Sequence, residues 1–301
     1  MKFIQRCIVL VIFCLFFSSG LHAAEHKVVV RAHHGIDDAF RQWQPTIDAL
    51  NEKLPAHEFV LTPIISLTEI SQRVGQGEFD FVLTNPSSFV EVEQLYGAKA
   101  LATLNNKRAN KAQDRFGGVI FTHVKNRDIL TIKDLKGKTL MAVSEPAFGG
   151  WQVAWLEMLK QGFDPYTELK ALVFTKSGIQ PDVVRAVRDR KVDAGVVRTD
   201  RLERMEDEGE IDMRYFRILN NKEVKDFPFF LSTALYPEWV FGATSHAPDD
   251  VGQKVKKILL ALHPVTKAAK AGKYMGWTAP RDYSSVRELM KRLKVGSYAS
   301  E

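Results

Sequence analysis

Apolar and polar residues follow two alternating periods along the chain, and these periods predict strands and helices in regular succession. Short apolar runs with polar residues on either side predict buried strands at 27–32, 58–65, 80–84, 139–143, 172–174 and 194–197. Elsewhere apolar residues recur at steps of three and four, as Phe40, Trp43 and Ile47 do, and predict helices that pack by one face. This order is typical of an α/β fold in which mostly parallel sheets are covered by helices on both faces.

The alternation of strands and helices occurs twice, on either side of about residue 117, and therefore predicts two lobes. Lobe 1 would comprise 25–116 together with 227–301, and lobe 2 would comprise 117–226. The apolar segments 117–122 and 227–235 would be the strands by which the chain crosses between the lobes. Two short crossings of this kind form a hinge.

The first residues of the chain predict export. Lys2 and Arg6 precede an apolar segment at 7–17, and two small residues follow at 23–24. This pattern is typical of a secretory signal peptide, here 1–24, cleaved near Ala23 or Ala24. The mature protein is therefore expected in the periplasm.

Composition excludes several classes of function. Both cysteines, Cys7 and Cys14, lie in the predicted leader, so no disulfide, thiol nucleophile or cysteine-ligated metal is expected in the mature protein. The net charge of +6 is too small an excess to predict a nucleic-acid partner. Neither a nucleophile elbow nor a phosphate-binding P-loop occurs, so we expect no enzymatic activity, no cofactor and no metal.

A strand followed by a glycine-rich helix start predicts one wall of an anion-binding cleft. The apolar run at 139–143 leads into Phe148, Gly149, Gly150 and Trp151, where a helical period begins. The first N–H groups of a helix have no partner within the helix and carry a partial positive charge, which favours anions. The alternatives are an ordinary strand–helix connection and, for Trp151, packing in the core.

Other candidate ligand contacts follow predicted strand ends or crossings. Arg198 and Thr199 come after the strand at 194–197, at the end where doubly wound sheets bind ligands. The alternative for Arg198 is a surface ion pair with Asp200 or Glu203. Arg115, beside the first crossing, is another candidate, and its alternative role is an inter-lobe ion pair. Thr84 and Asn85 are candidates that could instead only cap a helix. His34, in a loop, is the last candidate.

Several segments together resemble the phosphate/phosphite/phosphonate-type periplasmic binding proteins over essentially the whole mature chain. These segments are Asp80-Phe-Val-Leu-Thr-Asn-Pro86, Asp134-Leu-Lys-Gly-Lys138, Gly149-Gly150-Trp151-Gln152 and Val192-Asp-Ala-Gly195. A second set resembles the version that serves as the periplasmic sensor of histidine kinases, including tetrathionate-sensing ones. This set is Arg115-Phe-Gly-Gly-Val-Ile-Phe-Thr122, Phe148-Gly-Gly-Trp-Gln152, Arg198-Thr-Asp200 and Leu235-Tyr-Pro-Glu-Trp239.

The sequence departs from the phosphonate binders at two places. They have hydroxyl residues at the helix start, whereas this chain has Ala147-Phe148-Gly149-Gly150. Where this chain has Arg198, they also have an acidic residue, and an acidic residue suits an amino group on the ligand. A cation at this position would instead attract a second negative charge, so a more fully anionic ligand is expected.

The resemblance implies a two-lobe, type II solute-binding protein that closes on a small oxyanion, phosphonate- or phosphate-like or a sulfur oxyanion. Its partner would be the permease of an ABC transporter or a membrane histidine kinase, and the protein would be a monomer. The alternatives are a periplasmic enzyme on the same scaffold and a ligand-free accessory subunit of a sensor kinase system. Replacing Arg198 by alanine would weaken anion binding and leave the stability of the ligand-free protein nearly unchanged.

Overall fold

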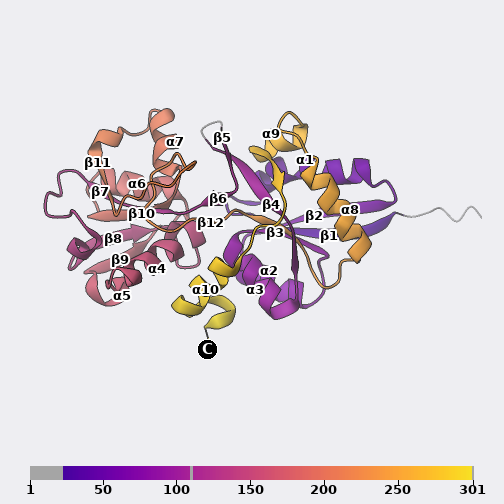
Figure 1. The fold of residues 1–301 in the computed structure, drawn as a ribbon, viewed down its shortest axis with the longest axis horizontal. Helices are drawn as coiled ribbons and strands as arrows, with labels where there is room; N and C mark the ends of the chain where they lie inside the picture. Colours follow the sequence, from indigo (N-terminus) through magenta and orange to yellow (C-terminus); the bar gives the residue numbers. More distant parts are fainter. Residues whose placement is uncertain (1–22, 109–110, 300–301) are drawn as a thin grey trace, which may run out of the picture.

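Two separate sheets divide the protein into two lobes that lie side by side (Figure 1). The structure, a computed structural model, describes residues 23–108 and 111–299. The first 22 residues of the predicted leader, with Cys7 and Cys14, lie outside the described residues. Within the described ranges, no helix is both long and apolar enough to cross a membrane.

Lobe 1 is built on the larger sheet, whose strand order is β14-β4-β13-β3-β1-β2, with β5 paired to β4. Strands β1, β2 and β3 are parallel to one another, whereas β13 and β14 run antiparallel to their neighbours. The sheet is therefore mixed, because the chain returns to lobe 1 in the opposite direction. Its strands are β1 (Ala24–Arg31), β2 (His57–Ile64), β3 (Phe81–Thr84), β4 (Lys99–Arg108), β5 (Lys111–Gln113), β13 (Val240–Ala243) and β14 (Tyr274–Thr278).

Helices cover both faces of this sheet, as the sequence predicts. One apolar core, centred on Trp43 and Ile47, lies under α1 (Ile36–Lys53), α8 (Asp249–Leu260) and α9 (Lys267–Gly272). The opposite face carries α2 (Leu67–Gly75), α3 (Pro86–Tyr96) and α10 (Ser284–Leu293). The predicted helix starts are confirmed, because Ser66 accepts from the backbone N–H of Glu69 and Asn85 from that of Ser88.

Lobe 2 is built on the smaller sheet, of order β11-β7-β10-β8-β9. Strands β8, β10 and β9 are parallel, and β7 runs antiparallel between β10 and β11. These strands are β7 (Gly118–His123), β8 (Thr139–Ala142), β9 (Ala171–Phe174), β10 (Ala194–Arg198) and β11 (Phe216–Leu219). The helices that cover them are α4 (Val153–Lys160), α5 (Pro165–Glu168), α6 (Gln180–Arg188) and α7 (Arg201–Asp207).

Two very short strands join the lobes, and they are not the segments that the sequence predicts. The crossings are β6 (Arg115–Phe116) and β12 (Tyr236–Pro237), which pair with each other antiparallel. The segment 117–122 instead belongs largely to β7, inside the sheet of lobe 2. The fold class itself, a two-lobe α/β protein, is as predicted.

The segment 227–235 forms no strand, although its composition predicts one. Its apolar residues Phe227, Phe229 and Leu231 form a small cluster of their own. Side-chain hydroxyls replace part of a strand ladder, because Ser232 Oγ accepts from the N–H of Ile120 and Thr233 Oγ1 accepts from that of Gly118. Apolar composition alone does not distinguish this arrangement from a paired strand.

Candidate anion-binding cleft between the lobes

Arg198 lies at the carboxyl end of β10, where lobe 2 meets the crossings. Its guanidinium stacks over the ring of Phe116 on β6, with Cζ 4.2 Å from the ring centroid. Its Nη2 donates to the carboxylate of Glu238, which is fully buried just after β12. Both crossings therefore hold Arg198, which makes it an inter-lobe residue rather than a surface one.

Asp200 connects this arginine to lobe 1. It lies directly before α7 in a left-handed backbone conformation, φ 73°, and its side chain is 4% exposed. Its carboxylate lies 3.6 Å from Nε of Arg198, 3.7 Å from Nη1 of Arg204 and 3.4 Å from Nε of Arg108. Arg108 belongs to β4, so this contact spans the two lobes.

We call Arg108, Arg198, Arg201 and Arg204, with Asp200 and Glu238, the inter-lobe arginine cluster. We include Arg31, because His33 lies within range of the charges of both Arg31 and Arg198. Arginines outnumber carboxylates in it, so the cluster has an excess of positive charge. Among the described residues, the buried nitrogens without a hydrogen-bond partner include Arg31 Nη1, Arg108 Nε, Arg198 Nε and Arg201 Nε. Two acceptors of the same region, Asp200 Oδ2 and Glu203 Oε2, also lack a hydrogen-bond partner. Buried polar groups are normally paired, so the polar groups gathered here are incompletely satisfied by one another.

Burial is the main cause of the lowered pKa values among these arginines. Burial, with the nearby charge of Arg204, lowers the pKa of Arg201 to about 10. Burial also lowers the pKa of Arg31 and of Arg108, only partly offset by Asp200 in the case of Arg108. Burial acts on Arg198 as well, but the charges of Glu238 and Asp200 outweigh it and raise its pKa. An anion would compensate the arginines whose pKa values are lowered.

Two histidines lie on the lobe 1 side of the cluster. The rings of His33 and His34 are 4.1 Å apart, and His33 lies 5.1 Å from the ring of Trp239. Desolvation, with His34 and Arg31 nearby, lowers the pKa of His33 to about 3. His33 is exposed, so water screens part of this shift. Desolvation and the charge of Arg201 lower the pKa of His34, which places this ring near lobe 2.

The glycine-rich helix start lies against Arg198, as a cleft wall would. Residues Phe148–Gln152 form a π-helical turn before α4. A Cβ atom on Gly149 would lie 2.6 Å from the ring of Phe116 and 3.1 Å from Cβ of Arg198, so only glycine fits there. Gly150 is similarly close to Val143. The backbone of this turn is thus held beside the guanidinium.

The two aromatic side chains of this turn are core residues. Phe148 packs edge-to-face with Phe116 and Tyr236, and Trp151 is completely buried and stacks with Trp155. The side chain of Trp151 thus packs in a core cluster of lobe 2, as in the alternative interpretation of this residue.

The other predicted contacts divide between the cleft and structural roles. Thr84 ends β3 with a buried hydroxyl that has no hydrogen-bond partner in the described part of the chain. Asn85 caps α3, and Thr199 Oγ1 accepts from the N–H of Gly117, so both side-chain oxygens already have partners. Arg115 lies on β6 opposite Pro237, half-buried beside the hinge.

Sequence reasoning missed Arg31, Arg108, Arg201 and Glu238. Arg31 had a usable signal, because it lies near the carboxyl end of the predicted strand at 27–32 in lobe 1, and Arg198 follows a predicted strand in lobe 2. Arg108 fell in a polar, basic stretch that reads as a connection. No local sequence pattern indicated Glu238, because its pairing with Arg198 depends on where the second crossing lies in the folded chain.

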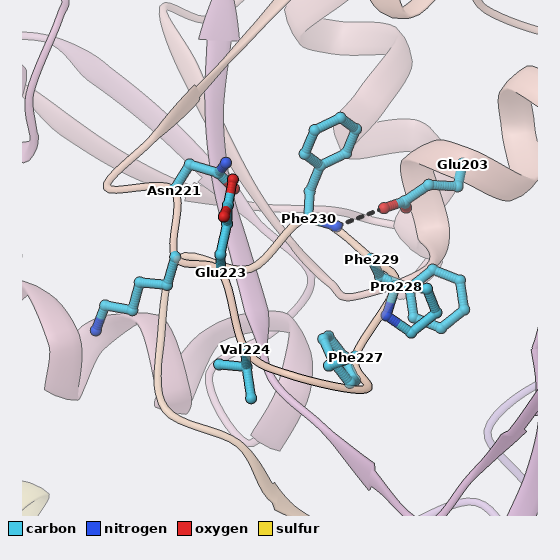
Figure 2. Close-up of a pocket in the computed structure, with 9 residues that line it drawn as sticks. Glu203, Asn221, Glu223, Val224, Phe227, Pro228, Phe229 and Phe230 are labelled. Atoms are coloured by element: carbon cyan, nitrogen blue, oxygen red, sulfur yellow. Dashed lines mark hydrogen bonds between the residues drawn. The ribbon is translucent and has the colours of Figure 1, made fainter.

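The described cavities do not coincide with this cluster. One cavity of about 400 Å³ lies in lobe 2, between α7 and the segment 221–230 (Figure 2). Its walls are the rings of Phe227, Phe229 and Phe230, and Glu203 Oε1 accepts from the N–H of Phe230 at 2.7 Å. A neighbouring cavity of about 440 Å³ extends to β5. Neither is lined by a member of the arginine cluster, so charge rather than cavity volume locates the candidate site.

Comparison with known proteins gives one curated relative and many structural neighbours. The sequence is 30% identical over 276 residues to the tetrathionate sensor histidine kinase TtrS of Salmonella typhimurium, covering 91% of this chain and 45% of the kinase. The chain thus spans about half the length of that relative.

Solved structures show the same fold. PhnD1 from Prochlorococcus marinus, in complex with methylphosphonate, has a TM-score of 0.68 at 15% identity, covering 91% of this chain and 99% of that one. XAC2383 from Xanthomonas citri, bound to ATP, has a TM-score of 0.67 at 18% identity, covering 89% and 95%. The family model for the ABC transporter, phosphonate, periplasmic substrate-binding protein matches residues 34–284. The chain belongs to this family of periplasmic phosphonate-type substrate-binding proteins.

Proposed function

We propose that this protein is a periplasmic solute-binding protein that captures a small oxyanion in the cleft between its lobes. The observation that supports it most strongly is the inter-lobe arginine cluster. Buried, unpartnered guanidinium nitrogens come from lobe 1, on Arg31 and Arg108, and from lobe 2, on Arg198 and Arg201. A ligand that bonds to both lobes favours the closed arrangement over the open one, which is how such a protein responds to its ligand.

The free energy of binding requires contributions from the arginines. A micromolar dissociation constant corresponds to about 8 kcal/mol. A helix N-terminus supplies about 0.3–1 kcal/mol when exposed and about 2 kcal/mol when partly buried. Hydrogen bonds to charged groups contribute about 1.5–3 kcal/mol each. The turn at Gly149 therefore contributes a minor part, and several guanidinium contacts are needed for the rest.

The excess positive charge of the cluster favours an anion with two negative charges. A phosphonate or phosphate-like group and a sulfur oxyanion both meet this requirement. The name of the relative TtrS refers to tetrathionate, and the PhnD1 structure contains methylphosphonate, so anions of both classes occur among similar proteins. Binding of an aminophosphonate would require an acidic residue at the position of Arg198. The arginine therefore supports a ligand without an amino group.

The partner of the closed form would be a membrane protein. Membership of the family supports the permease of an ABC transporter, and the resemblance to TtrS supports a histidine kinase. The protein would act as a monomer without enzymatic activity, after cleavage of its leader in the periplasm.

An anion screen tests this function. Thermal unfolding of the purified protein would be measured with chloride, sulfate, thiosulfate, tetrathionate, phosphate and methylphosphonate, followed by calorimetric titration of those that raise Tm. We expect at least one divalent oxyanion to bind and chloride to bind far more weakly. Absence of binding by all of them would favour the ligand-free accessory subunit, and turnover of a bound anion would favour the enzyme.

A further inference from the structure

We infer that Glu238 is a positioning residue for anion binding, which holds the guanidinium of Arg198 in the orientation that the ligand requires. The inference rests on the proposed function. It assigns to Glu238, which directly follows the second crossing, the positioning of Arg198. Glu238 itself need not touch the anion.

The carboxylate of Glu238 is fully buried and has donors on both oxygens. Oε1 accepts from Nη2 of Arg198 and from Nδ2 of Asn106 at 2.6 Å, and Oε2 accepts from the N–H of Trp239 at 3.1 Å. A carboxylate without solvent exposure is stable in its ionised form only with such partners. Its position is therefore determined by lobe 1 and the crossing, and that position determines where Nη2 of Arg198 lies.

The backbone of Glu238 is fixed as firmly as its side chain. Its N–H donates to the carbonyl of Asp114, beside the first crossing, at 2.9 Å. Its carbonyl accepts from the hydroxyl of Tyr283 at 2.9 Å, and that hydroxyl also contacts Thr103 on β4. Glu238 thus joins both crossings to the sheet of lobe 1.

Two parts of the guanidinium are held in place, and its Nε has no hydrogen-bond partner. Glu238 holds Nη2, and Phe116 lies under the plane of the group. Nε lies 3.6 Å from the carboxylate of Asp200, which Arg108 of lobe 1 and Arg204 of lobe 2 also approach. Fixing Nη2 and the plane fixes the direction of Nε, so loss of the Glu238 contact would let this donor turn away.

Two substitutions separate positioning from charge. Glu238→Asp keeps the negative charge but withdraws the carboxylate by one methylene, so that it no longer reaches Arg198 and Asn106 together. Glu238→Gln keeps the length and one acceptor oxygen for both donors but removes the charge. Positioning predicts that the aspartate variant binds anions about tenfold or more weakly, whereas the glutamine variant stays within about threefold of wild type or binds more tightly.

The experiment is calorimetric titration of sulfate, tetrathionate and methylphosphonate into wild type and both variants, with Tm measured in parallel. Thr46→Val is the matched control, because it removes the buried hydrogen bond from Thr46 to Tyr274, within lobe 1, and should lower Tm without changing Kd. If aspartate binds as wild type does while glutamine binds more tightly, Glu238 acts only through its charge. If Tm falls in both variants while Kd stays constant, its role is structural only.

Arg198→Ala distinguishes failure of the inference from failure of the proposed function. Weakened binding by Arg198→Ala with wild-type binding by Glu238→Asp would overturn the inference alone. Wild-type protein that binds none of the three anions would overturn the proposed function and the inference with it.

Discussion

Arg108 in lobe 1 and Asp200 in lobe 2 form an ion pair between the lobes, with 3.4 Å between Nε and the carboxylate. Both side chains are largely buried, at 18% and 4% exposure, yet Arg108 Nε makes no hydrogen bond among the described residues. The pair therefore contributes attraction between the lobes while leaving a donor unpaired. Separation of the two lobes would break this contact.

The first prediction concerns Arg198. Arg198→Ala should weaken binding of the native anion by about tenfold or more, since a charged hydrogen bond contributes about 1.5–3 kcal/mol. The structure changes the expected effect on stability. Removing Arg198 leaves Glu238 buried without its cation, which should cost about 3 kcal/mol of unfolding free energy. Calorimetric titration and denaturant unfolding measure the two effects.

A double variant separates the loss of affinity from the loss of stability. Arg198→Ala with Glu238→Gln removes the uncompensated charge, so it should recover much of the stability but none of the affinity. Arg214→Ala is the control, because Arg214 is 89% exposed and pairs only with neighbouring Asp212 among the described residues. Wild-type affinity in Arg198→Ala would mean that Arg198 serves the hinge alone.

The second prediction concerns closure. Arg108→Ala removes the inter-lobe ion pair, so the ligand-free protein should populate the open arrangement more and show a larger radius of gyration by small-angle scattering. Saturating anion should reduce the difference from wild type. Lys254→Ala, which breaks an exposed ion pair within α8, should leave the radius unchanged. Identical scattering of all three proteins in the absence of anion would contradict the role of Arg108 in closure.

The third prediction concerns the wall of the cleft. Gly149→Ala places a methyl group 2.6 Å from the ring of Phe116, so either the turn or the ring beneath Arg198 must move. Affinity should fall by about tenfold, measured by titration. Gly252→Ala is the matched control on α8, where the added methyl meets its neighbours at 3.8 Å and should be neutral or slightly stabilising. Equal affinities in the two variants would place the turn outside the site.

The fourth prediction concerns pH. Burial raises the pKa of Glu203, so its ionised form destabilises the folded state at neutral pH. This cost is present in full above the raised pKa and disappears as pH falls toward the ordinary pKa of a glutamate. Glu203→Gln should therefore raise Tm at neutral pH, and the gain should vanish near about pH 4. A gain that is independent of pH would show that charge is not its cause.

The fifth prediction concerns export. The precursor should lose 23 or 24 residues on secretion, because Ala23 and Ala24 supply the small residues that cleavage requires. Intact-mass spectrometry of protein from the periplasm measures this directly. A mature protein that retains Met1 would contradict the predicted localisation.

The fold and part of the site could be predicted because their signals are local. The caps at Ser66 and Asn85, the strand that ends at Arg198 and the glycine-rich turn after β8 each depend on a few consecutive residues. Crossing strands were misplaced because Gly118–His123 has the apolar composition of any buried strand, and composition does not say which sheet a strand joins.

The sequence by itself determined the order of strands and helices, the two-lobe class and the position of Arg198 at a strand end. Only the tertiary structure decided that Arg198 pairs with Glu238, that Arg108 meets Asp200, and that Trp151 is buried in the core. The physical reason is that capping and periodicity act between residues a few positions apart, whereas an ion pair between residues far apart in the chain forms only when the packing of both lobes brings them together. The charge between the lobes is a property of that packing, because its arginines come from the ends of β1, β4 and β10 and from α7.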